Sequence, residues 1–321
     1  MEGRIVLKEK KYIKDVINYC KEKNIRFEYI AEDDAKYFVM NNNNFYNLID
    51  YKNNFEKYLK GTKQDKYIDL DFMYLIDLSI IDFRLRLLLF EMIIDIEHYL
   101  KIKILNIIET IDKCDGIKIV NSYLENDYNT KKKIHNSIFK KVGSSYYKKI
   151  FSNYDIDGDN KLENIPIWEF LKIITFGELV NFYDYFTKYY SLKKEQQDIR
   201  ILIEIVKLRN AVAHNTLILI DLDEKDNEYP PNYKIVKYLQ NCEINLKTRT
   251  NKLKNSRIRQ ITYTLYMFNE VVTSEGNKKK IRGDINKLFY KRILLHKEYY
   301  KNNNLLKSIY DYFDKIIIKY Y

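Results

Sequence analysis

The sequence predicts an all-α protein. Only 3 Pro and 8 Gly interrupt its 321 residues, and Ile, Leu, Lys, Asn and Tyr are abundant, so long uninterrupted elements are expected. Neither Gly nor Pro occurs from Asp69 to Thr110, which leaves room for a very long helix. With 46% hydrophobic and 31% charged residues, the composition fits a folded soluble chain and excludes a mostly disordered one.

The chain divides into three predicted segments. Residues 1–66 form an N-terminal helical segment, in which the run Asn41–Asn44 is expected to be a loop between two helices. Residues 67–220 form a helical core that begins with one very long helix, or two in sequence. Residues 221–321 begin with an acidic, Pro-containing loop and continue as basic helices that reach the last residue.

The middle of the chain contains an aspartate-rich loop. Asp155, Asp157 and Asp159 stand at alternate positions, as in a calcium loop, but Gly158 is misplaced and Pro166 occupies the position of the bidentate Glu. We therefore expect no metal and no cofactor. A helix is predicted to begin near Pro166, with a break or a close helix approach at Gly177, and a strong helix covers 199–219.

The cysteines and the N-terminus indicate a compartment. Cys20, Cys114 and Cys242 are odd in number and lack CxxC spacing, so neither a disulfide framework nor a thiolate zinc site is expected. No signal peptide and no uncharged stretch of membrane-spanning length is evident. We expect a cytoplasmic protein.

The excess positive charge lies in the last quarter of the chain. Residues 247–321 carry 18 Lys and Arg against 6 Asp and Glu, whereas the whole chain has a net charge of +11. This asymmetry favours a surface that faces a polyanion, and the alternative is a solvated Lys-rich face. The candidate phosphate-binding residues are Lys247, Arg249, Lys252, Lys254, Arg257 and Arg259.

Polar residues interrupt the apolar pattern of the helix over 199–219. One core-facing row contains Ile203, Val206 and Asn210, and a second contains Leu202, Ile205 and Arg209. Buried polar groups need partners or a cavity, so Arg209 and Asn210 are candidate functional residues. His214 lies one turn after Asn210 on the same face, and the long side chain of Arg209 lets it reach a common cleft.

The long helix has a matching pattern. Arg86 and Glu97 lie within an apolar stripe, where charges are costly unless they are paired or used. A separate polar face is expected to be solvated; it contains Asp77, Arg84, Glu91, Asp95 and His98.

These residues together resemble a known family. The run from Arg209 to His214 resembles the R-polar-x3-H motif of HEPN ribonucleases, and its surroundings resemble the AbiD/AbiF group of Abi-like abortive-infection proteins. Three further pieces match that group in order and extend the resemblance over about residues 30–220. They are Leu85-Arg86 with Ile96-Glu97, Pro166 with Trp168, and Phe176-Gly177-Glu178-Leu179.

The resemblance implies a HEPN-like helical bundle and metal-independent RNA cleavage, in which the 2′-hydroxyl attacks the adjacent phosphate. His214 suits proton transfer near neutral pH, and Arg209 suits stabilisation of charge at phosphorus. Asn210 would orient His214 or the phosphate. Glu97 would either position Arg209 and tune His214 or form a structural ion pair with Arg86.

The chain contains a single motif of this kind, so by this resemblance it carries only half of a HEPN site. HEPN sites are typically composite, so the resemblance implies a two-fold homodimer with both His214 side chains at the interface. RNA is then the expected partner, as substrate and as a possible cognate non-coding RNA. Tyr263 and Tyr266 follow the basic run closely enough to stack on bases, although the pattern of their helix favours a core position.

Three functions remain open on this reading. The first is an abortive-infection toxin that cuts RNA. The second is a non-catalytic or latent HEPN-like scaffold that holds a structured antitoxin RNA, and the third is a helical partner protein whose motif is accidental.

Overall fold

The computed structural model describes residues 13–111, 116–126, 132, 164–226 and 232–321. Throughout these ranges the regular elements are helices, together with two isolated β-bridges, so the predicted all-α class is confirmed. The first part of the chain forms α1 (Ile13–Glu22), α2 (Glu32–Asn41), α3 (Phe45–Asp50), the 3₁₀ turn η1 (Tyr51–Asn54), α4 (Phe72–Ile111) and α5 (Ile117–Asn126). The middle forms α8 (Ile167–Ile173), α9 (Phe176–Tyr189), α10 (Lys193–Gln196) and α11 (Ile199–Ala213).

The last ninety described residues form a second group of helices. They are α12 (Tyr233–Asn241), α13 (Leu246–Lys254), α14 (Ser256–Val271), α15 (Glu275–Asn286), the π-helical η2 (Lys287–Arg292), the 3₁₀ segment η3 (Ile293–Tyr300) and α16 (Asn304–Tyr320). The backbone leaves helical geometry at His296, so the chain bends between α15 and α16.

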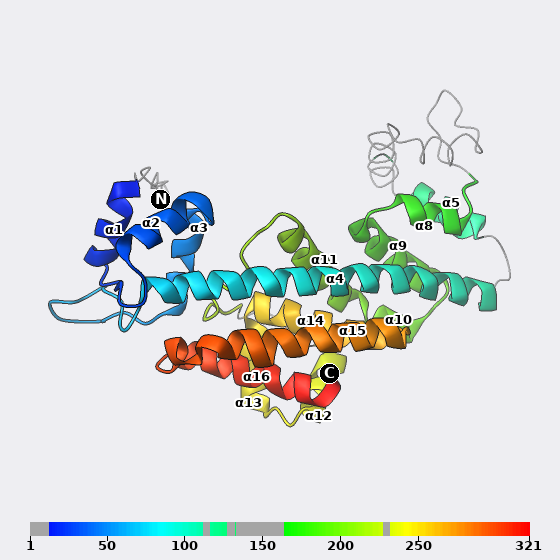
Figure 1. The fold of residues 1–321 in the computed structure, drawn as a ribbon. Helices are drawn as coiled ribbons and strands as arrows, with labels where there is room; N and C mark the ends of the chain where they lie inside the picture. Colours follow the sequence, from blue (N-terminus) through cyan, green and yellow to red (C-terminus); the bar gives the residue numbers. More distant parts are fainter. Residues whose placement is uncertain (1–12, 112–115, 127–131, 133–163, 227–231) are drawn as a thin grey trace, which may run out of the picture.

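Helix α4 organises the molecule. Its 40 residues form one continuous helix about 60 Å long, as the absence of Gly and Pro allows. Figure 1 shows α1–α3 at one end of α4, α5, α8 and α9 at the other, and α14, α15 and α16 along one side. The alternative of two helices in sequence is wrong.

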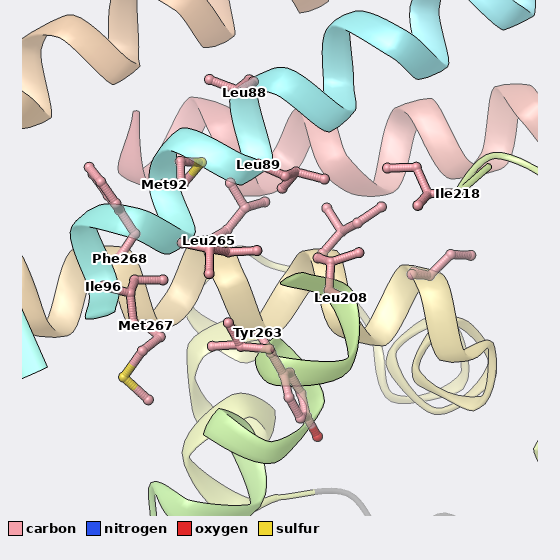
Figure 2. Close-up of a cluster of buried hydrophobic side chains, with 14 of the residues drawn as sticks. Leu88, Leu89, Met92, Ile96, Leu208, Ile218, Tyr263, Leu265, Met267 and Phe268 are labelled. Carbon is pink, nitrogen blue, oxygen red and sulfur yellow. The ribbon is translucent and has the colours of Figure 1, made fainter. Parts of the chain in front are cut away.

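The centre of the core lies where α4, α11 and α14 meet. Figure 2 shows Leu89 and Met92 of α4, Leu208 of α11 and Leu265 of α14 in one buried cluster. Helix α14 packs against both α4 and α11, so the C-terminal helices share the core of the preceding segment. Burial of apolar side chains of this kind supplies most of the free energy that favours folding.

Two predicted boundaries are confirmed by their capping residues. Helix α2 ends at Asn41, and the side chain of Asn44 accepts a hydrogen bond from the Tyr46 N–H at the start of α3. Helix α8 begins directly after Pro166. The break predicted at Gly177 lies slightly earlier, because Thr175 and Glu178 form a capping box that starts α9.

Gly177 is not needed for a close helix approach either. It lies inside the first turn of α9, and a Cβ atom built on it would be 3.7 Å from Val206 Cγ1, an ordinary van der Waals distance. The contact between α9 and α11 therefore does not require a glycine at this position.

The polar face predicted on α4 is only partly solvated. The carboxylate of Asp77 is buried and accepts hydrogen bonds from Arg292 at 2.6 Å and from the Tyr300 hydroxyl at 2.7 Å. Asp95 accepts from Asn277 at 3.2 Å, and Glu91 pairs with Lys280 of α15. Arg84 and His98 are exposed as predicted, so the prediction is right for these two residues and wrong for the buried Asp77.

Helix α11 corrects another prediction. The row containing Ile203, Val206 and Asn210 does not face the core, since Ile203 is 42% exposed and Asn210 is exposed. The second row is right, because Leu202 and Ile205 are fully buried. The aspartate-rich loop around Gly158 lies outside the described residues.

Candidate functional site

The candidate site lies at the C-terminal end of α11. His214 is the cap residue, and Asn215 follows it with a left-handed backbone at φ +58°. The Thr216 N–H donates to the Ala211 carbonyl at 2.9 Å and the Asn215 N–H to the Val212 carbonyl at 3.2 Å. This Schellman arrangement ends the helix and turns the chain, because Asn tolerates positive φ better than most residues.

The three motif residues are all accessible at this helix end. His214 and Asn210 are exposed, and Arg209 is half-buried. The Arg209 Nη1 group donates to Asn210 Oδ1 at 3.4 Å, and within the described chain Arg209 meets no carboxylate. The imidazole of His214 likewise has no hydrogen-bond partner among the described residues. The side chains are therefore open to a phosphate or another anion.

A buried network on α4 holds the segment that follows His214. Asp82 Oδ1 accepts the backbone N–H groups of Ile218 at 2.9 Å and Leu219 at 2.7 Å. Asp82 Oδ2 pairs with Arg86 Nε at 2.6 Å, and Arg86 Nη1 donates to Asn215 Oδ1. One carboxylate thus anchors both a guanidinium and two backbone amides.

The predicted ion pair between Arg86 and Glu97 is wrong. The two residues are 11 positions apart on one helix, or about 16 Å along its axis. Arg86 pairs with Asp82 one turn away, whereas Glu97 pairs with Lys101 at 2.9 Å. Arg86 contacts Asn215, the residue after His214, so this part of α4 lies beside the end of α11. Glu97 lies about three turns further along α4 and is therefore far from His214.

Sequence reasoning missed Asp82 and Asn215. Asp82 stands four residues before Arg86, a spacing that places acidic and basic side chains on one helix face, so this partner was detectable. The contact with Asn215 was not detectable, because it joins residues 129 positions apart.

A family model described as Abi-like protein matches residues 39–219. This match covers more than half of the chain. The chain belongs to the Abi-like family. No curated protein matches the chain, and no solved structure matches it either.

The matched region of this Abi-like chain ends where the buried network ends. It includes Asp82, Arg86 and the motif residues, and its last residue is Leu219, whose N–H binds Asp82. The family accordingly indicates a role in abortive infection, a form of phage defence. The C-terminal helices lie beyond the match.

One of the basic residues predicted to lie on the surface of the Abi-like chain is buried. Arg259 is 4% exposed; it pairs with Glu204 at 3.4 Å and Asp226 at 3.6 Å, and it donates to the Leu253 carbonyl at 3.0 Å. A guanidinium that is buried and paired in this way cannot bind the phosphates of a nucleic acid. The prediction for Arg259 is wrong, because its helix turns it toward α11.

The other five basic candidates differ in exposure. Lys247 is exposed, whereas Arg249 donates to the Ile244 carbonyl at 3.1 Å and Arg257 donates to Gln260 at 3.0 Å. Burial lowers the pKa of Lys252, and Lys254 is half-buried. Burial also lowers the pKa of Arg257, while the nearby carboxylates of Asp82 and Glu204 act in the opposite direction. Of this set, Lys247 is the most available to a partner.

The two tyrosines belong to the core. Tyr263 is fully buried, and Tyr266 is buried with its ring 5.2 Å from that of Tyr238 in an edge-to-face contact. Figure 2 shows Tyr263 inside the buried cluster. The stacking prediction is therefore wrong, and the core alternative is confirmed.

The described part of the Abi-like chain contains no group of three or more His, Cys, Asp or Glu side chains arranged to hold a metal ion. None of its helices combines the length and apolarity that a bilayer crossing needs.

Proposed function

We propose that this Abi-like protein acts in phage defence as a HEPN-type, metal-independent endoribonuclease. The observation that carries the proposal is the accessible pair formed by Arg209 and His214 at a helix end held by a buried network. An arginine that meets no carboxylate among the described residues and an exposed imidazole supply the two groups that phosphodiester cleavage requires. Membership of the Abi-like family supplies the biological setting.

The proposed reaction uses the 2′-hydroxyl of RNA as the nucleophile. A base removes the 2′-hydroxyl proton while the oxygen forms a bond to the adjacent phosphorus. The bond from phosphorus to the 5′-oxygen breaks, and an acid protonates that oxygen, which leaves a 2′,3′-cyclic phosphate and a 5′-hydroxyl. His214 moves a proton, and Arg209 stabilises the negative charge that develops on the phosphate oxygens. Asn210 accepts a hydrogen bond from Arg209 and orients it.

We further propose that two chains complete the site, because each chain carries one such histidine. Helix α4 exposes an apolar stripe formed by Phe83 (50% exposed), Leu87 (55%) and Ile94 (50%). The stripe begins beside the motif: the Arg86 guanidinium lies 5.6 Å from the centre of the Phe83 ring and also binds Asn215. A second copy on this stripe would bring two His214 side chains near each other, one as acid and one as base.

The dimer is tested by sedimentation of the wild-type chain and Leu87→Glu. We expect a wild-type dimer and a folded monomeric variant, because a charge on the stripe opposes its burial. The matched control is Leu59→Glu, which alters an exposed leucine away from α4. A wild-type monomer, with or without RNA, contradicts the composite site.

The activity is tested with His214→Ala and Arg209→Ala, with His98→Ala as the control, since His98 is exposed on α4 and outside the motif. Growth inhibition and RNA cleavage are measured, and product ends are analysed for cyclic phosphate. We expect both motif variants to lose at least about 100-fold in cleavage rate with an unchanged melting temperature. Cleavage by His214→Ala at the wild-type rate contradicts the mechanism.

The same experiment addresses the alternative of a non-catalytic scaffold that holds a structured antitoxin RNA. Salt-dependent RNA binding by a pure wild-type dimer that cuts no RNA supports the scaffold over the enzyme. The RNA that copurifies with the protein then identifies the partner.

A further inference from the structure

A large apolar cavity lies on the other side of α4 from the exposed stripe. It has a volume of about 660 Å³, is partly open to solvent, and is lined by α4, α14, the η2 and η3 segments and α16. Leu89 and Met92 of α4, Leu265 of α14 and Phe313 of α16 contribute to its wall. Figure 2 shows Leu89, Met92 and Leu265 together between their helices. The inner lining is aliphatic and aromatic.

The cavity is a pocket that is partly open to solvent and mostly apolar. Water in the apolar part of such a pocket lacks hydrogen-bond partners, so its displacement by an apolar group is favourable. Binding sites for small molecules fall between about 300 and 1,000 Å³ and are mostly apolar. The cavity therefore has the size and lining of a ligand site.

The mouth of the cavity carries charged groups. Lys297 and Lys301 are exposed at the rim, and within the described residues neither ammonium group forms an ion pair. Lys307 donates to the Lys301 carbonyl at 3.0 Å. Of the two acidic rim residues, Glu298 lies 3.7 Å from His296, and Asp311 is on α16. Two unpaired ammonium groups beside an apolar interior suit an anion attached to an apolar chain.

We propose that this cavity binds a single-chain amphiphile with an anionic head group. The chain fills the space between α4, α14 and α16, and the head group lies at the rim beside Lys297 and Lys301. A fatty-acid carboxylate and a lysophospholipid phosphate share this chemistry. The inference does not rest on the proposed nuclease activity.

The cavity also shares a wall with the segment that follows the motif. Leu219 and Leu222 contribute side chains to the lining. The opposite side of the same segment is held by Asp82, which binds the Leu219 N–H, and by Asn54, which accepts the Leu222 N–H at 3.1 Å and donates to the Leu219 carbonyl at 2.7 Å. An occupant that packs against these leucines stabilises the segment that starts directly after His214.

Binding is tested by calorimetry on the full chain with three probes. They are hexadecanoate, 1-palmitoyl lysophosphatidate and hexadecanol, and the last has the chain without the charge. We expect saturable binding of at least one anionic probe at one site per chain, and weaker binding of hexadecanol. A difference between the two anions identifies the preferred head group. Absence of saturable binding for both anions overturns the proposal.

Two variants locate the ligand. Leu89→Phe/Leu265→Phe narrows the cavity and should weaken binding of every probe, whereas Leu59→Phe, on an exposed leucine, should not alter it. Lys297→Gln/Lys301→Gln should weaken binding of the anionic probe about fivefold and leave hexadecanol unchanged. Its control is Lys237→Gln/Lys279→Gln, at two exposed lysines outside the lining. Unchanged anion binding by the rim variant, or by a narrowed variant with a native circular dichroism spectrum, overturns the assignment.

Hydrogen exchange separates a site in this cavity from binding at the protein surface. Saturating hexadecanoate should slow exchange of the Ile218 and Leu219 amides, which Asp82 holds, and leave the Arg249 amide of α13 unchanged. At the same hexadecanoate concentration the narrowed variant should show less slowing. Equal protection in both proteins overturns the proposal.

Discussion

Arg86 of α4 donates a hydrogen bond to the side-chain carbonyl of Asn215, the residue that follows His214. The contact joins the central helix to the end of the motif helix. Arg86 is itself held by Asp82, which also binds two backbone amides after the motif. The geometry of the helix end therefore depends on residues far from it in sequence, and substitutions there should have specific consequences.

Asp82→Asn should destabilise the fold by about 3 kcal/mol, because it leaves the buried Arg86 guanidinium without its counter-charge. Urea unfolding measures the loss. Asp33→Asn breaks an exposed pair with Lys36 and serves as the control, for which no measurable change is expected. A loss below about 1 kcal/mol for Asp82→Asn would show that the network contributes little.

Arg259→Ala and Lys247→Ala should separate a structural role from a surface role. Arg259→Ala should cost about 3 kcal/mol in unfolding free energy, since it leaves the buried Glu204 without the guanidinium. Lys247→Ala should leave stability unchanged and reduce the slope of log affinity for RNA against log salt by about 0.7 to 0.9. If Arg259→Ala is as stable as the wild type and lowers the slope of log RNA affinity against log salt, Arg259 has a surface role and not a structural one.

Two glycines should respond to alanine with opposite signs. Gly116 has φ +69°, and a Cβ atom there would lie 2.7 Å from Ile167 Cβ, so Gly116→Ala should destabilise by about 2 kcal/mol. Gly283 lies in α15 with open space around it, so Gly283→Ala should stabilise by about 0.5 to 1 kcal/mol. Thermal and urea unfolding measure both changes. Changes of the same sign would contradict this account.

The stability of the wild-type chain should fall relative to Cys242→Ala as the pH rises above 9. Burial raises the pKa of the Cys242 thiol from 9.0 to about 11, so the unfolded chain loses this proton first. The contribution is fully present below pH 9 and is lost as the pH approaches 11. Between pH 8.5 and 10.5 the stability difference should change by about 2 kcal/mol. A pH-independent difference in denaturant unfolding would exclude this ionisation.

Several parts of the fold were predictable because they depend on local chemistry. The run Asn41–Asn44 interrupts two apolar patterns and forms the predicted loop, and the first residue after Pro166 starts a helix. The long stretch without Gly or Pro forms the predicted helix as a single element. The helix predicted over 199–219 also forms, although it ends at Ala213, six residues before the predicted limit, with His214 as its cap.

The wrong predictions concern which face of a helix is covered by other helices. Asp77 and Arg259 are charged, and their positions favoured solvent, yet each is buried against an oppositely charged partner from another helix. Ile203 is apolar and remains exposed, since no described helix covers that side of α11. The type and spacing of residues predict which of them share a face of a helix. They do not predict which other helix will pack against that face.

The chain alone was sufficient to indicate its helical class, the ends of several helices, its family and the motif at residues 209–214, because each follows from residues close together in sequence. Long-range packing was needed to show that Asp82 holds the segment after the motif, that Glu97 lies far from it, and that a cavity adjoins it. These features arise from groups far apart in the sequence, such as Asp82 and Ile218 at 136 positions, whose contacts depend on the whole assembly of helices in three dimensions.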